Sequence, residues 1–116
     1  MESIINIFKS VKRRKWPISR LEKECLAEKW DIHFANKAIN GLDFTIACRQ
    51  LCREQGFESS LVLCMLQNRT LHIMLSCKGY FLDSLKNDID SNLKYLVVAT
   101  SGLKPADGWT INRRMA

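Results

Sequence analysis

The sequence lacks several features that mark common functional classes. Its 116 residues are too few for a two-domain enzyme and predict one compact domain with a short appendage. No apolar run approaches the roughly 20 residues that cross a bilayer, since the longest such stretches are Leu61–Leu66 and Leu71–Leu75. Only two prolines and five glycines interrupt a chain that is 47% hydrophobic, which argues against disorder and against fibrous or repeat architectures.

Secretion and metal signals are also missing. The apolar stretch Met1–Val11 precedes the first basic run, which reverses the order found in a signal peptide. Five cysteines cannot all pair within one chain, and none has metal-ligand spacing to another cysteine or to the two histidines. We therefore expect reduced thiols in a cytoplasmic protein, with no metal and no cofactor. The cysteines are Cys25, Cys48, Cys52, Cys64 and Cys77.

Acidic residues are scarce at the start of the chain. The net charge is +6, and residues 1–20 carry most of the excess, with Glu2 as their only acid. A basic run next to a tryptophan can bind nucleic acid or an anionic membrane surface, with the indole on a base or at the interface. The alternative is a solvated helix end, where cations suit the helix dipole. The candidate binding residues are Lys12, Arg13, Arg14, Lys15 and Trp16.

Periodic apolar positions predict three helices in the first half of the chain. The first ends near Lys15, because Pro17 disfavours helix in the preceding residue. The second begins at a capping box formed by Ser19 and Glu22 and runs to about Trp30. The third covers Asp43–Gly56, with the glycine as its carboxyl-terminal cap. Residues 1–39 thus form a basic helical segment that either packs on the domain or reaches a partner, and residues 40–116 form the core.

The second half of the chain changes to strand patterns. Near-continuous apolar and β-branched runs, separated by turn residues, are typical of strands. Helices followed by an antiparallel β meander make an α+β fold. The expected strands are Ser60–Leu66, Leu71–Cys77, Tyr80–Ser84, Lys94–Ala99 and a short Trp109–Ile111.

One predicted hairpin brings a histidine and a carboxylate together. With Lys78-Gly79 as the turn, Met74 faces Asp83, and His72 lies diagonally from Asp83 on the same sheet face. A carboxylate beside an imidazole fixes its tautomer and raises its pKa, as a general base serving a nucleophile requires. The alternative is a satisfied polar contact in a half-buried sheet.

The segment from Asn40 to Trp109 resembles the bacterial transglutaminase-like cysteine peptidases, a branch of the papain-like and transglutaminase-like fold that also occurs in phage genomes. The strand Leu71–Leu75 resembles the family's His-Ala-Val-Leu strand, and Tyr80–Ser84 resembles its Leu-Asp-Asn strand. The resemblance implies that His72 is the catalytic histidine and Asp83 the triad carboxylate. Tyr95 and Trp109 fall at the family's later landmarks.

The sequence departs from this family at the nucleophile. The family's helix-opening Gly-Asp-Cys-Glu-Asp-Tyr-Ala motif falls on Ile39–Thr45, so Gly41 occupies the position of the catalytic cysteine. A reactive thiolate needs the amino end of the helix, where free amides lower its pKa. Cys48 and Cys52 lie farther along the helix on its apolar face, as core residues do.

Three hypotheses follow. The first is a catalytically inactive transglutaminase-like domain that binds a protein partner or serves a structural role, in the cytoplasm or, if phage-encoded, in the virion. His72 and Asp83 are then relics of a catalytic site. The second is an active cysteine peptidase or amidase that uses a non-standard thiol with the same pair. The third is a basic nucleic-acid or membrane-surface binder that uses Lys12–Lys15.

Overall fold

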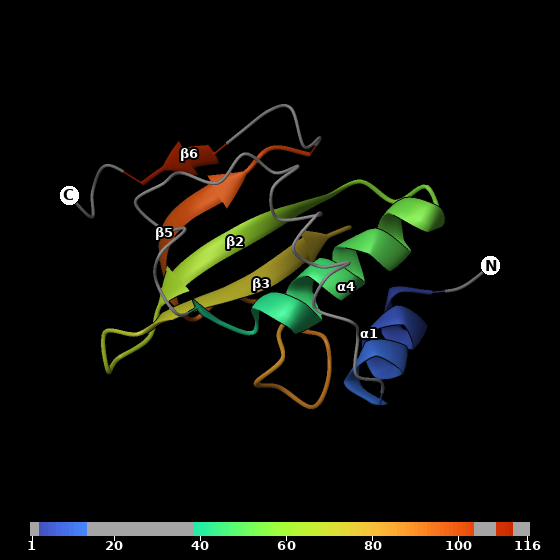
Figure 1. Cartoon of the computed structure of the whole chain (residues 1–116), viewed down its shortest axis with the longest axis horizontal. Coiled ribbons are helices and arrows are strands. Elements are labelled where there is room, and N and C mark those ends of the chain that lie inside the picture. The colour runs from blue at the N-terminus through green and yellow to red at the C-terminus, as the bar shows by residue number, and fades with distance from the viewer. Residues whose placement is uncertain (1–2, 14–38, 104–108, 113–116) are drawn as a thin grey trace.

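The computed structural model describes residues 3–13, 39–103 and 109–112 (Figure 1). Within these ranges a helix precedes the strands, which confirms the α+β class. The predicted helix Ser19–Trp30, the thiol of Cys25 and the basic-run residues Arg14, Lys15 and Trp16 lie outside the described residues. The elements are α1 (Ile4–Arg13), β1 (Ile39–Asn40), α4 (Leu42–Glu54), β2 (Ser59–Met65), β3 (Leu71–Cys77), β4 (Tyr80–Leu82), β5 (Leu96–Ser101) and β6 (Trp109–Ile111).

The strands form one sheet in the order β1-β3-β2-β5-β6, with β4 also paired to β3. Strands β2, β3 and β4 are consecutive antiparallel neighbours, as in a meander, and so are β5 and β6. The meander expectation differs from the structure at β5, which returns to pair with β2 instead of β4. Strand β1 pairs in parallel with the start of β3, whereas β4 pairs with its end. The end of β1 and the end of β4 therefore approach each other beside the middle of β3.

Glycines in the left-handed region bound helix α4. Gly41 precedes the helix with φ 78°, and Gly56 follows it with φ 77°. The amide of Gly56 donates to the carbonyl of Arg53, and that of Phe57 donates to Cys52, which together form a Schellman motif. The helix predicted at Asp43–Gly56 is thus confirmed, with Gly56 at its carboxyl-terminal end.

The β3-β4 turn has the geometry that the hairpin prediction assumed. Lys78 and Gly79 have φ of 52° and 81°, the two positive values of a type I′ turn. Leu75 then pairs with Leu82, which is the predicted register. Strand β4 ends at Leu82 instead of Ser84.

The predicted fourth strand is displaced along the chain. It was expected at Lys94–Ala99, whereas β5 spans Leu96–Ser101. A bulge between Leu63 and Cys64 shifts its pairing with β2. The short strand expected at Trp109–Ile111 is confirmed as β6.

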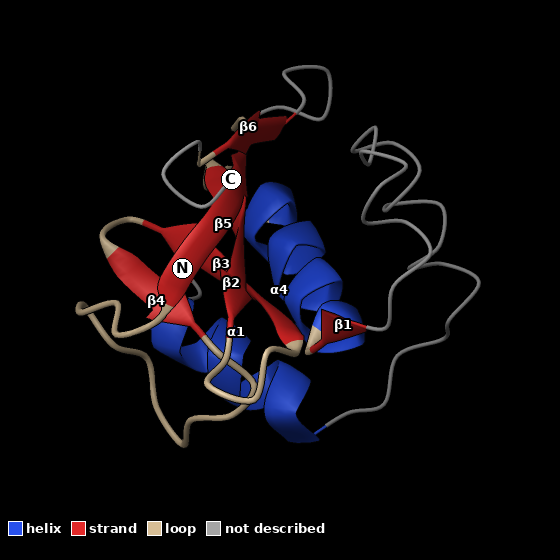
Figure 2. Cartoon of the chain, turned by 90° about the vertical axis from the view of Figure 1, so that its left-hand side faces the viewer, coloured by secondary structure: helices blue, strands red, loops and turns tan. Residues whose placement is uncertain are grey.

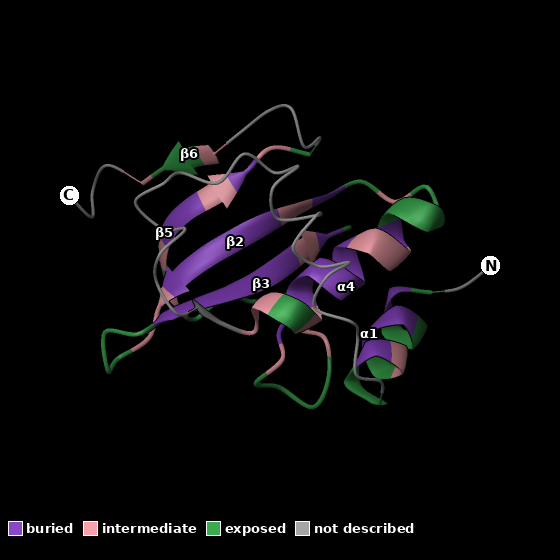
Figure 3. Ribbon diagram, in the orientation of Figure 1, coloured by how far each residue is buried: buried purple, intermediate pink, exposed green. Residues whose placement is uncertain are grey.

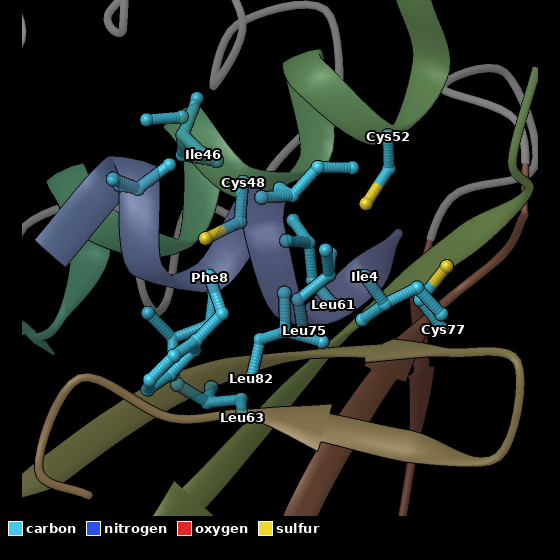
Figure 4. Close-up of a cluster of buried hydrophobic side chains, with 14 of the residues drawn as sticks. Ile4, Phe8, Ile46, Cys48, Cys52, Leu61, Leu63, Leu75, Cys77 and Leu82 are labelled. Atoms are coloured by element: carbon cyan, nitrogen blue, oxygen red, sulfur yellow. The ribbon is translucent and has the colours of Figure 1, made fainter. Parts of the chain in front are cut away.

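The two described helices cover one face of the sheet (Figure 2). Side chains from α1, α4 and that face of β2 and β3 form the main core, of which Figure 4 shows a part. Figure 3 shows buried positions on both helices and along β2 and β3. The segment 1–39 was expected either to pack on the domain or to reach a partner, and its first helix packs on this core through Ile4, Ile7, Phe8 and Val11. Phe8 contacts Phe44 edge to face at 5.4 Å between ring centroids. No helix in the described ranges has the length and apolarity needed to span a membrane.

Candidate functional site

His72 and Asp83 form a buried pair on the sheet face away from the helices. Alternation along β3 directs Leu71 and Ile73 into the helix-covered core and His72 to the opposite face. The imidazole Nε2 lies 2.6 Å from Asp83 Oδ1, and both residues are buried. The convergence predicted from the hairpin register is confirmed. So short a contact between buried partners is typical of a charge-assisted hydrogen bond.

The surroundings of Asp83 favour its charged form. Burial acts to raise the pKa of Asp83, but the hydrogen bond to His72, the Leu85 amide, the charge of His72 and the Tyr95 hydroxyl together bring it below its ordinary value. The Leu85 amide donates to Oδ1 at 2.9 Å. Tyr95 also stands edge to face against the His72 ring, with 5.8 Å between centroids. Three neighbours thus hold one carboxylate in place.

The second imidazole nitrogen of His72 has no hydrogen-bond partner among the described residues. This atom, Nδ1, is buried. In a catalytic triad one ring nitrogen meets the carboxylate and the other meets the nucleophile. Since Nε2 is taken by Asp83, Nδ1 is the atom that a nucleophile would need to approach.

Gly41 lies against this imidazole. A Cβ atom built on Gly41 would be 3.0 Å from Cε1 of His72, the ring carbon bonded to both nitrogens. It would also be 2.7 Å from Ser84 Oγ and 3.0 Å from the Ile73 carbonyl oxygen. The helix-opening position that the resemblance assigns to the nucleophile therefore adjoins His72, but it carries no side chain. Its positive φ and its crowded surroundings both favour glycine.

The described thiols are all buried, and one lies near the pair. Cys64 is directly opposite His72 in the β2-β3 register. Burial, followed by the charge of Asp83, raises the pKa of Cys64 to about 12. Because the thiolate is the nucleophile, a thiol with this pKa is unreactive near neutral pH.

The other described thiols lie elsewhere. Burial raises the pKa of Cys48 far above its ordinary value. A hydrogen bond from Cys52 lowers the pKa of Cys77, with burial opposing it and Lys78 assisting it. Cys77 is at the opposite end of β3 from His72, however, about 16 Å along an extended strand. None of these sulfur atoms is placed to use the imidazole as a base.

The structure brings part of the basic run to the same region. Lys12 Nζ donates to the backbone carbonyl of Ser84 at 2.9 Å, which ties the end of α1 to the loop after Asp83. Arg13 Nε donates to the carbonyl of Lys9 in its own helix. Sequence reasoning missed the Lys12 contact because 72 positions separate the two residues. Binding of nucleic acid or an anionic surface by this run stays a prediction.

Two further observations complete the site. Tyr95 was singled out only through the family resemblance, and its hydrogen bond to Asp83 had no signal in the residue pattern. No cluster of three or more metal-binding side chains occurs among the described residues.

Comparison of the chain with protein-family models, curated proteins and solved structures found no match.

Proposed function

We propose that the chain is a catalytically inactive transglutaminase-like domain that serves as a protein-binding or structural module. The observation that carries the proposal is the glycine at the start of α4, directly beside the His72 imidazole. Nucleophilic catalysis requires a side chain there that the imidazole can deprotonate. Glycine supplies none, while the histidine and its carboxylate persist.

The His72–Asp83 pair has a structural role in this proposal. It links the middle of β3 to the loop that follows β4, inside an apolar surrounding that includes Cys64 and Met74. A buried hydrogen-bonded pair is costly to break, because removing one partner leaves the other unpaired. The pair therefore fixes the β3-β4 edge whether or not a reaction takes place there.

The partner class follows from the resemblance and from charge. Domains of this type occur in phage genomes, so a virion component is included in the proposal. A chain of net charge +6 is attracted to partners with an acidic surface. The proposal requires the partner to be bound by the folded domain, with no chemical change in it.

Alkylation of the native protein tests the absence of a catalytic thiol. Iodoacetamide at pH 6 modifies only thiols whose pKa is depressed, and mass spectrometry assigns the rate at each of the five cysteines. We expect Cys48 and Cys64 to react at least about 100-fold more slowly than in urea-unfolded protein, because they are fully buried as well as protonated.

His72→Gln provides the second arm of this experiment. In an inactive domain the substitution does not slow any thiol by removing a base, and the pattern of rates is retained. One rapidly alkylated cysteine that becomes slow in His72→Gln would instead identify a working nucleophile and overturn the proposal. Cys64→Ser is the matched variant that reveals whether that thiol is the one opposite His72.

A further inference from the structure

An open groove lies beside the buried pair, at the end of the sheet where the β2-β3 turn meets the segment before β5. Its volume is about 780 Å³. A much smaller pocket of about 20 Å³ shares Lys94 and Tyr95 with the groove and reaches Asp83. The groove is lined by Met65, Leu66, Gln67, Asn68, Arg69, Leu85, Lys94, Tyr95 and Leu96.

Apolar side chains gather in this groove although they face solvent. Leu85 and Leu96 are 56% and 55% exposed, the two largest values among the exposed large apolar residues of the described chain. Met65 and Leu66 add half-buried apolar surface next to them. Isolated exposed apolar residues need no explanation, but a contiguous group marks a surface for interaction.

The charged residues of the groove are all basic. Arg69 and Lys94 line it, and neither aspartate nor glutamate does. Lys86 lines the small pocket next to it, with its Nζ over the Tyr95 ring, 5.9 Å from the centroid. A ligand that fills the groove therefore meets apolar surface flanked by positive charge.

The rim that carries Arg69 is held in one conformation. Leu66 and Thr70 are joined by a backbone hydrogen bond of 3.0 Å, and the Arg69 amide donates to Leu66 at 2.9 Å. The side chain of Asn68 accepts from the amide of Thr70. Arg69 itself has φ 64°, a left-handed conformation that is uncommon outside glycine. A rim ordered before binding reduces the entropy lost on binding.

We infer that this groove docks a segment of a protein partner in which apolar anchor residues are flanked by aspartate or glutamate. The inference rests on the proposed function and specifies the surface and partner chemistry of that binding module. Leucine-type side chains would cover Leu85 and Leu96, and carboxylates would meet Arg69 and Lys94. Nucleic acid fits less well, because the lining has four aliphatic or thioether side chains and only one aromatic ring for base stacking.

Short fluorescein-labelled peptides provide the test. One alternates leucine with glutamate, a second replaces glutamate with lysine, and a third replaces leucine with alanine. We expect the Leu-Glu peptide to bind at least about tenfold more tightly than either of the others, since it alone offers both contacts. Its binding should shift the amide NMR signals of Gln67–Arg69 and of Leu96.

Variants of the groove identify the contacts. Arg69→Glu and Leu96→Glu should each weaken Leu-Glu binding by about tenfold or more. Lys9→Glu likewise replaces a basic residue and Ile111→Glu an aliphatic one, both at exposed positions outside the groove, and they should leave the affinity unchanged. The double variant Arg69→Glu with Lys94→Glu should reverse the preference and favour the Leu-Lys peptide.

Several outcomes would overturn the inference. Equal affinity for the Leu-Lys peptide, signals that shift outside the groove, or competition by an oligo-dT strand for the same residues would each do so. Mass spectrometry of the peptide after every titration shows whether it has been cleaved. An intact, unbound Leu-Glu peptide rejects the groove and leaves the inactive-module proposal standing, whereas a bound and cleaved peptide rejects inactivity and retains the groove.

Discussion

Alternate residues of β3 point into two different environments. On the helix-covered face, Leu71, Ile73 and Leu75 join the main core beneath α1 and α4. On the other face, Met74 belongs to a small apolar cluster around which His72 pairs with Asp83. The first face is sealed by helices, and the second adjoins an open groove. One side of the strand is therefore covered by helices, and the groove for which we propose a partner lies on the other side.

The polar groups of the two faces differ in the same way. On the helix side, Thr45 donates to the Ile73 carbonyl and so satisfies a backbone acceptor at the sheet edge. On the other side, an ionisable pair retains one unused nitrogen, Nδ1 of His72. Satisfied backbone acceptors stabilise a fold without adding chemistry. An imidazole with one unpaired nitrogen is what the proposed loss of a catalytic nucleophile would leave.

The largest expected effect is the loss of stability when the packing of the helix-covered face is disrupted. Phe8→Ala removes a buried ring that packs against Phe44, and should lower the free energy of unfolding by about 3–5 kcal/mol. Urea denaturation measures it. Ile5→Ala, at a 43% exposed position of the same helix, should change stability by less than about 0.5 kcal/mol. Equal effects of the two substitutions would mean that α1 does not seal the core.

Acid should weaken the opposite face through Asp83. The pKa of this carboxyl is lower in the folded protein than its ordinary value of 3.8, so its stabilisation is present above that value and is lost as the pH falls through the folded value. Asp83→Asn should cost about 2–3 kcal/mol at neutral pH and flatten the loss of stability below about pH 4. Urea midpoints between neutral and acidic pH measure both effects.

The exposed carboxylate of Asp88 supplies the control for this experiment. Within the described ranges it accepts one hydrogen bond, from the amide of Ile89 next to it in the chain, at 2.9 Å. Asp88→Asn should retain the acid dependence of the unmodified protein. If Asp83→Asn also retains it, then the buried pair does not contribute the acid-sensitive stabilisation.

A smaller effect compares the two glycines that bound α4. Both have φ near +77°, so alanine should cost about 1 kcal/mol at each from backbone conformation alone. A Cβ at Gly56 meets nothing within 4 Å, whereas at Gly41 it meets Ser84 and His72. Gly41→Ala should therefore be more destabilising than Gly56→Ala by about 1–2 kcal/mol in urea denaturation.

Gly41→Cys extends this comparison to chemistry. The side chain must displace Ser84 or the His72 ring, so we expect a loss of stability no smaller than that of Gly41→Ala and no peptidase activity. A stable Gly41→Cys protein with a rapidly alkylated thiol at pH 6 would show instead that the site still accommodates its nucleophile. That result would make the glycine the single lesion in an otherwise complete triad.

Local patterns predicted the hairpin and the pair within it. The turn residues Lys78 and Gly79 specify a two-residue connection, and strand alternation then puts His72 and Asp83 on one face. This predicted the convergence of the imidazole and the carboxylate, and the structure shows that Nε2 and Oδ1 are the atoms that meet. The resemblance to a peptidase family assigned the same two residues, and it added Gly41 as their neighbour.

Long-range pairings could not be predicted in this way. Strand β1 has only two residues, too few to show any alternation, and β5 pairs with β2 because of tertiary packing and not because of its nearest turn. Arg49 shows the same limit. Arginines are ordinarily exposed, but this side chain is buried and donates to Ser101 Oγ and to two backbone carbonyls of the following loop.

The smallest expected effect is a shift in the ionisation of Tyr95, on the groove side of the sheet. Burial, and then the charge and hydrogen bond of Asp83, raise the pKa of Tyr95 above its ordinary value of 10.0. The chain has only two tyrosines, so Tyr80→Phe leaves Tyr95 as the one phenol that an absorbance titration detects. Adding Asp83→Asn should move its ionisation to lower pH, because a negative charge beside the phenolate disappears. An unchanged midpoint would mean that burial alone governs Tyr95, and that the wall of the groove is not electrostatically connected to the buried pair.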